Sequence, residues 1–298
     1  HLDLHSFPTR RSSDLFTGAE MAGIKIHAAI DAVIRQNRVY RTHRGLWLDW
    51  MAQGTRVTQN LFYDNISEDL FVEVNHGPFM VDNNLFLSPT SLLDMSQGGA
   101  YAHNLFTGRI TNRPEPDRET PYHPPHSTTV AGLAKTTGGD HRYFNNLFVG
   151  NGTPPTAEQK AKLEEIRWIS SHGLWGYDGR EFPLFTGGNA YYHHAHPSAR
   201  EGNALLLTDL NPALELVDEG DRVLLRFTTG QDLRQTPTAL VTTERLGQTR
   251  VAGLPFVNAD GSPLTIDTDY FGHRRSQSRP TPGPFEKTGS GARTVRVW

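Results

Sequence analysis

The tripeptide Asn-Leu-Phe recurs along the chain, and its spacing restricts the possible fold more than any other feature. Complete copies begin at Asn60, Asn84, Asn104 and Asn146, while looser copies begin at Asn37 and Asn189. Successive copies are 23, 24, 20, 42 and 43 residues apart, so the last two intervals span two turns or one turn with an insertion. This period is typical of stacked repeats, and buried Asn side chains can form a hydrogen-bonded ladder between them. The Leu-x-x-Leu-x-Leu spacing of leucine-rich horseshoes is absent, so we expect an all-β parallel β-helix.

Two short runs, GLWLD at 45–49 and DLFVE at 69–73, share one pattern at a spacing of 24 residues. Each alternates with period two, which buries the aliphatic residues and directs Asp49 and Glu73 outward. On adjacent strands, ~4.8 Å apart, the two carboxylates would approach the roughly 5–5.5 Å separation of retaining glycosidases. Residues 23–27 are the preceding copy, which places His27 in the same column, and residues 91–95 are expected to follow.

The simplest interpretation is that this column is a set of solvated surface charges without a catalytic role, as most outward carboxylates are. Trp47, Asn75 and His76 beside it form a combination of aromatic and hydrogen-bonding groups that suits a sugar. Two neighbouring carboxylates also repel one another, which raises the pKa of one and suits a general acid. The spacing alone leaves both interpretations open.

Composition excludes several other classes of protein. The 298 residues carry a net charge of −3, which predicts no nucleic-acid partner, and no apolar run is long enough to cross a membrane. Without cysteine there are no disulfides or thiolate metal sites. The histidines at 123, 126, 193, 194 and 196 have irregular spacing, so we expect no metal and no cofactor. The compartment is undecided, with a cytoplasmic location slightly favoured over a secreted one, and the oligomeric state is unknown.

The chain divides into three parts. Residues 1–15 resemble a translated sequencing adapter and are treated as non-native. Residues 16–198 are the predicted solenoid, with insertions at 109–139, expected as a loop, and at 152–185. The second insertion contains a predicted helix at 156–171, where Thr156 and Gln159 form a capping box. Residues 199–298 are a predicted C-terminal β extension that caps the solenoid, with strands expected at 204–216, 222–228 and 240–246.

Three segments, 20–25, 47–56 and 69–78, resemble the glycoside hydrolase family 120 β-xylosidases. The resemblance implies a right-handed parallel β-helix that carries a β-sandwich domain, and a retaining, exo-acting enzyme. It implies that Asp49 is the nucleophile, Glu73 the acid/base and Glu20 a substrate-binding residue. Ala19 departs from the histidine expected there. The family's N-terminal half is expected to be missing, which leaves the activity of this fragment open.

We therefore predict a retaining exo-glycosidase that hydrolyses xylose-containing oligosaccharides through Asp49 and Glu73. Its predicted substrate-binding residues are Glu20, Trp47, Asn75, His76, His126 and His141. One alternative is a polysaccharide lyase with Lys25 near its base, although no cluster of Asp residues for calcium is present. The other alternative is a non-catalytic carbohydrate-binding solenoid.

Overall fold

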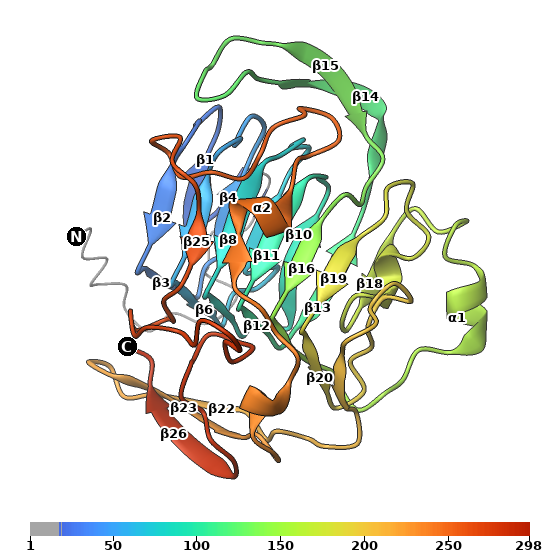
Figure 1. The fold of residues 1–298 in the computed structure, drawn as a ribbon. Helices are drawn as coiled ribbons and strands as arrows, with labels where there is room; N and C mark the ends of the chain where they lie inside the picture. The colour runs from blue at the N-terminus through green and yellow to red at the C-terminus, as the bar shows by residue number, and fades with distance from the viewer. Residues whose placement is uncertain (1–17, 19) are drawn as a thin grey trace.

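The computed structural model describes residue 18 and residues 20–298, so the adapter-like segment 1–15 lies outside the described residues. Up to residue 112, consecutive strands visit three sheets in turn, and each strand after the first three pairs with the strand three places earlier (Figure 1). The three strands of one such turn are called a rung. Within the three sheets all pairs are parallel except that of β13 (Arg109–Asn112) with β18 (Ile169–Ser171), an arrangement consistent with the predicted β-helix.

We call these sheets A, B and C. Sheet A contains β1 (Ile24–Ile26), β4 (Leu46–Leu48), β7 (Leu70–Val72), β10 (Thr90–Asp94), β13 (Arg109–Asn112) and β18 (Ile169–Ser171). Sheet B contains β2 (Val33–Arg35), β5 (Arg56–Thr58), β8 (Phe79–Asp82), β11 (Gly99–Ala102), β16 (Arg142–Phe144) and β19 (Phe185–Gly187). Sheet C contains β3 (Arg38–Tyr40), β6 (Leu61–Tyr63), β9 (Leu85–Phe86), β12 (Leu105–Phe106), β17 (Leu147–Val149), β20 (Ala190–Tyr192) and β21 (Leu205–Leu207).

The repeated asparagines lie at the corner between sheets B and C and form the predicted ladder. The Nδ2 group of Asn84 donates to Oδ1 of Asn104 at 3.0 Å, and Asn104 donates to Asn146 at 3.1 Å. The same pattern runs from Asn37 to Asn189, whose amide donates to the Glu201 carboxylate at 2.8 Å. The residue before each ladder Asn has a positive φ between 55° and 70°, which turns the chain sharply there. The ladder therefore satisfies buried amides at a corner where no strand can pair them.

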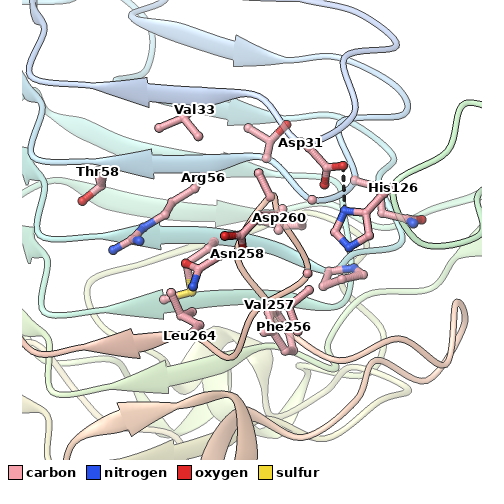
Figure 2. A pocket seen from close by; sticks show the side chains of 18 of the residues that line it. Asp31, Val33, Arg56, Thr58, His126, Phe256, Val257, Asn258, Asp260 and Leu264 are labelled. Atoms are coloured by element: carbon pink, nitrogen blue, oxygen red, sulfur yellow. Dashed lines mark hydrogen bonds and ion pairs between the residues drawn. The ribbon is translucent and has the colours of Figure 1, made fainter.

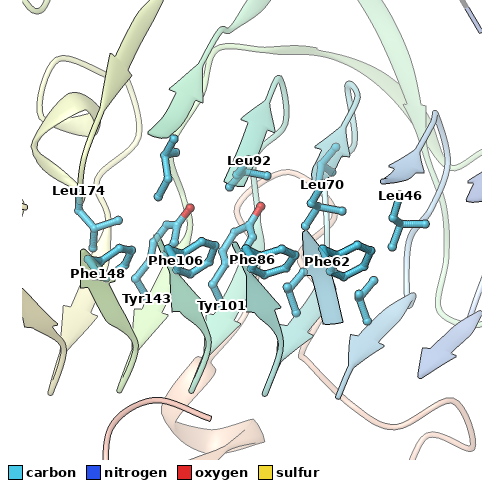
Figure 3. Close-up of a cluster of buried hydrophobic side chains, with 14 of the residues drawn as sticks. Leu46, Phe62, Leu70, Phe86, Leu92, Tyr101, Phe106, Tyr143, Phe148 and Leu174 are labelled. Atoms are coloured by element: carbon cyan, nitrogen blue, oxygen red, sulfur yellow. The ribbon is translucent and has the colours of Figure 1, made fainter. Parts of the chain in front are cut away.

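The interior of the stack is filled by aromatic and aliphatic side chains that repeat from rung to rung. Phe62, Phe86, Phe106 and Phe148 stack in one column, with neighbouring ring centroids 5.1–5.2 Å apart (Figure 3). Leu46, Leu70 and Leu92 supply the facing layer from sheet A. Their register, Leu46↔Leu70↔Leu92, shows that residues 91–95 do continue the repeat.

The first insertion is a β-hairpin where a loop was expected. Residues 109–112 remain in sheet A as β13, and the hairpin consists of β14 (Glu115–Tyr122) and β15 (Gly132–Thr136). It extends back along the stack, across the top of Figure 1, towards the first rungs. The candidate active site depends on this path of the hairpin back to the first rungs.

The helix predicted at 156–171 is much shorter in the structure. The capping box of Thr156 and Gln159 is present, but α1 covers only Ala157–Ala161. Ile169 instead pairs with Asn112 of β13, because an extended strand satisfies the edge of sheet A and buries Ile169 beside Leu163 and Trp175. The prediction of the helix start was confirmed, and the prediction of its length was wrong.

The C-terminal part seals the outer faces of two of the three sheets. Strands β22 (Glu215–Asp218), β23 (Val223–Thr228) and β26 (Ala292–Arg296) form an antiparallel sheet that packs over sheet C. Strands β24 (Val241–Thr242) and β25 (Thr265–Ile266), with α2 (Thr243–Leu246), pack over sheet B. Two expected strands differ, because β21 still belongs to the parallel sheet C and residues 243–246 are helical.

Candidate active site

The candidate site lies at the ends of β1, β4 and β7 on the outer side of sheet A. The register aligns Lys25 with Trp47 and Trp47 with Phe71. The residues two positions further along, His27, Asp49 and Glu73, continue the same alternation. Backbone hydrogen bonds from Asp49 to Ile26, at 3.0 Å, and from Glu73 to Leu48, at 2.9 Å, extend the pairing to these positions. The two carboxylates are therefore on neighbouring strands, as the repeat predicted.

Asp49 is almost enclosed, with 9% of its side chain exposed. Its Oδ2 atom lies 3.0 Å from Nζ of Lys25 and 3.2 Å from Nδ1 of His27, and Oδ1 accepts the backbone N–H of Trp50 at 2.8 Å. Burial raises the pKa of this carboxyl, but the hydrogen bonds from Trp50, Lys25 and His27 outweigh it, so the pKa is lowered. The site thus holds Asp49 as an anion, which is the form a nucleophile needs.

Glu73 has a different set of partners. Its Oε2 atom accepts the indole N–H of Trp47 at 3.1 Å, and its Oε1 atom accepts from Arg118 at 2.7 Å. The Arg118 guanidinium also lies 4.6 Å from the ring centroid of Trp50. Each carboxylate is therefore held by its own cation, Lys25 for Asp49 and Arg118 for Glu73, which distinguishes two otherwise similar acids.

Arg118 reaches Glu73 because the hairpin is anchored beside the site by His76. The Nε2 atom of this buried ring lies 2.8 Å from the Thr120 hydroxyl of β14, and Nδ1 lies 2.9 Å from the amide of Gln97. Burial lowers the pKa of His76 to about 4, so the ring is neutral at pH 7. His76 was predicted to bind substrate, but with 3% of the residue exposed it positions the hairpin instead.

Asn75 is also an organising residue and contacts the backbone around both acids. Its amide donates to the carbonyls of Leu48 and Glu73, at 3.2 and 3.0 Å, and accepts the N–H of Ala52 at 2.7 Å. Only 2% of Asn75 is exposed, so the structure places it under the site and not against a sugar.

Glu20 and Trp47 adjoin the pair in different ways. The Glu20 side chain is 71% exposed and pairs with Lys25, which links it to Asp49. Trp47 is 5% exposed, because Lys25 lies 3.7 Å from its ring centroid and the Phe71 ring lies 5.0 Å away. Its indole N–H holds Glu73, while its faces are covered.

The other two predicted substrate-binding histidines lie elsewhere. His141 is fully buried inside the stack, with Nε2 2.9 Å from Oδ2 of Asp94, so no sugar can reach it in this structure. His126 lies near the hairpin tip, with Nδ1 2.8 Å from Oδ2 of Asp31 (Figure 2). That pair borders a cavity of about 730 Å³ between sheet B and residues 254–268. Among the described residues, the lining of this cavity includes neither Asp49 nor Glu73.

Arg118 and Trp50 are the site residues that sequence reasoning missed. Arg118 lies in a polar insertion, and only the return of the hairpin brings it to a carboxylate 45 residues away. The 8-residue strand Glu115–Tyr122 and its partner Gly132–Thr136 carry a weak signal, since Thr and Tyr at 120 and 122 favour strands. In the described part of the chain, no group of three or more His, Asp or Glu side chains is arranged to hold a metal.

A scan against protein-family models gave no match, and a search of curated proteins gave none. A solved structure described as "The complex structure of XylC with xylose" matches with a TM-score of 0.82 and 38% identity over 95% of this chain. This match confirms the resemblance to the family 120 β-xylosidases. The chain spans about half, 46%, of XylC. None of the helices in residues 18 and 20–298 has the length and apolarity needed to cross a bilayer.

Proposed function

We propose that this chain carries the catalytic pair of a retaining, exo-acting glycosidase for xylose-containing oligosaccharides, mounted on a right-handed parallel β-helix. The observation that carries the proposal is the placement of Asp49 and Glu73 at equivalent positions of neighbouring strands, each with its own cationic partner. The 38% identity to XylC, whose structure contains xylose, supports the choice of sugar. We also propose that the chain consists of a solenoid followed by a C-terminal cap.

In the first step Asp49 attacks the anomeric carbon of the terminal sugar while Glu73 gives a proton to the leaving oxygen. The lowered pKa of Asp49 supports its role as nucleophile, since the anion carries the electron pair. In the second step Glu73 takes a proton from water, which attacks the same carbon and releases the sugar from Asp49. In this proposal Glu20 binds hydroxyls of the terminal sugar, and its exposure and its link to Asp49 through Lys25 support that role.

The proposal is tested by trapping the covalent intermediate. An activated 2-deoxy-2-fluoro-xyloside should label the chain once, and peptide mass spectrometry should place the label on Asp49. Labelling should be absent from Asp49→Asn and largely retained in Glu73→Gln, because the activated leaving group needs no proton, with Asp221→Asn, an exposed acid, as the matched control.

The same preparation separates the alternatives. Incubation with xylo-oligosaccharides should release xylose, with the β anomer formed first. An unsaturated product that absorbs in the ultraviolet would instead identify a lyase. Sugar binding without labelling or turnover would leave a carbohydrate-binding solenoid and contradict the proposal.

A further inference from the structure

The outer column of sheet A continues beyond the catalytic pair. The backbone N–H of Met95 donates to Val72 at 3.0 Å, and that of Arg113 donates to Asp94 at 2.7 Å, which extends the strand pairing past β10 and β13. Met95 is therefore beside Glu73, and Arg113 is beside Met95, with a guanidinium nitrogen 4.0 Å from the Met95 sulfur. One line of side chains thus runs along the stack from Asp49 to Arg113.

Trp168 ends this line. Because Ile169 pairs with Asn112, Trp168 is the residue opposite Arg113, and the Arg113 guanidinium lies 4.4 Å from the centroid of its ring. Trp168 is 56% exposed, whereas Trp47 and Trp175 are 5% and 6% exposed. A single exposed aromatic residue is common on protein surfaces, but this one is held by a cation in line with two candidate catalytic acids.

The surroundings of the ring suit a sugar. Its neighbour Arg167 pairs with Glu115 at 2.8 Å and Asp117 at 2.6 Å, which fixes the segment against the hairpin. The hydroxyls of Thr111 and Ser170, 2.7 Å apart, lie on the adjoining strands. An aromatic face beside hydroxyl groups and charged side chains can bind both the C–H face and the hydroxyls of a pyranose.

The order of residues sets the direction of the substrate. Glu20 and Lys25 lie on the Asp49 side, so the terminal sugar belongs there, and the leaving group extends past Glu73 towards Met95. Trp168 is three strand positions beyond Glu73, about 14 Å at ~4.8 Å per strand. A pyranose in an extended oligosaccharide covers about one strand spacing, so the third sugar of the leaving group reaches the ring.

Building on the proposed function, we propose that Trp168 is a stacking platform for the leaving group, so that the site favours oligosaccharides of about four or more sugars over disaccharides. The ligand class is a linear, neutral xylo-oligosaccharide. Stacking on the Trp168 ring is enough to bind a pyranose that carries no carboxylate, and such a sugar needs no additional cationic side chain as a partner. Trp168 sets chain-length preference and takes no part in bond cleavage.

The test measures binding to the full chain in an Asp49→Asn background, so that the ligand is not consumed. Isothermal titration calorimetry should show tighter binding of xylohexaose than of xylobiose. Trp168→Ala should weaken the binding of xylohexaose about 2- to 10-fold, as expected for loss of one stacking contact, and leave the binding of xylobiose unchanged. Trp168→Phe, which keeps an aromatic face, should lose less affinity for xylohexaose. Trp298→Ala, which removes a 40% exposed Trp of the C-terminal segment, should change the affinity for neither ligand.

Several outcomes overturn the inference. Equal affinity of the two ligands, an unchanged xylohexaose affinity in Trp168→Ala, equal loss for both ligands, or no binding of either ligand would each exclude the platform. Failure of the proposed function is recognised separately. If the length-dependent effect of Trp168 appears but Asp49 is never labelled by the fluoro-xyloside, the platform stands and the glycosidase proposal fails.

Discussion

The B–C corner and the end of sheet A each recur once in every turn of the same repeat, yet they are built on opposite principles. At the B–C corner the same residue recurs in every rung, as in Asn84, Asn104 and Asn146. At the end of sheet A the residue changes in every rung, from Asp49 to Glu73 to Met95. Constancy in a stack reflects a structural need that is identical in each rung. A position that varies while its backbone stays in register is free to carry chemistry.

The outer faces of the three sheets differ in the same way, because sheets B and C are covered by hydrophobic packing and sheet A carries the candidate site. The C-terminal segment packs hydrophobic side chains over sheets B and C, where Phe256 and Phe227 are buried. The outer face of sheet A carries the candidate site, and the hairpin crosses the strand ends with polar contacts from Arg118 and Thr120. Changes at the sheet A end should therefore affect activity, and changes at the B–C corner should affect stability.

The largest effect is expected at Glu73. Glu73→Gln keeps the shape and the Trp47 contact but removes the proton donor, so hydrolysis of an unactivated xylo-oligosaccharide should fall about 100- to 10,000-fold. Steady-state release of xylose measures this. With an aryl xyloside whose leaving group needs no proton, the first step should be largely preserved. Equal losses on both substrates would contradict the role of Glu73 as acid.

The ladder should give the converse result. Asn104→Ala removes a side chain that accepts from Asn84 and donates to Val81 and Asn146 in a fully buried position. The free energy of unfolding should fall by about 2–4 kcal/mol, because several buried groups lose their partners. Chemical denaturation measures this.

Asn37→Ala is the matched control, because the half-buried end of the ladder should lose only about 1 kcal/mol. If both variants lost the same stability, the ladder would not act as a continuous buried network. Loss of activity in a folded Asn104→Ala protein would break the contrast between the two regions.

The His76 anchor predicts a pH dependence on the site side. Its pKa is lowered to about 4 in the folded chain from 6.5, so the unfolded chain binds the proton more readily between these values. The stabilisation is complete above about pH 6.5 and is lost as the pH falls towards 4, with a total on the order of 3 kcal/mol. Comparison of wild type with His76→Gln by denaturation at pH 7.5 and 4.5 isolates this contribution. An unchanged difference between the two proteins at the two pH values would exclude it.

The smallest effect is expected for Arg118. Its side chain is 39% exposed, so Arg118→Gln should lower kcat/KM no more than about 5-fold. Arg118→Lys should restore part of the loss, since it retains the charge, and Arg279→Gln, at an exposed position in the C-terminal segment, is the control. A loss as large as that of Glu73→Gln would give Arg118 a direct part in the reaction.

The local pattern of the sequence determined the features that repeat at short range. The Asn spacing predicted the ladder, and the alternation in 45–49 and 69–73 predicted that Asp49 and Glu73 share a column. These predictions succeeded because period and register depend on neighbouring residues and on one repeated turn. The capping box at Thr156 could be predicted for the same reason, since it depends on neighbouring residues.

Tertiary structure alone decided the partners that come from distant segments. Ile169 left its predicted helix for the edge of sheet A, His141 was drawn into the core beside Asp94, and Arg118 reached Glu73 by way of the hairpin. None of these contacts has a local signature, because each is selected by the burial and hydrogen bonding available once the stack has formed. The sequence by itself determined the stack and the placement of two acids on it. Which side chains face them was settled by long-range packing, since only the folded chain brings residues 45 or more positions apart into contact.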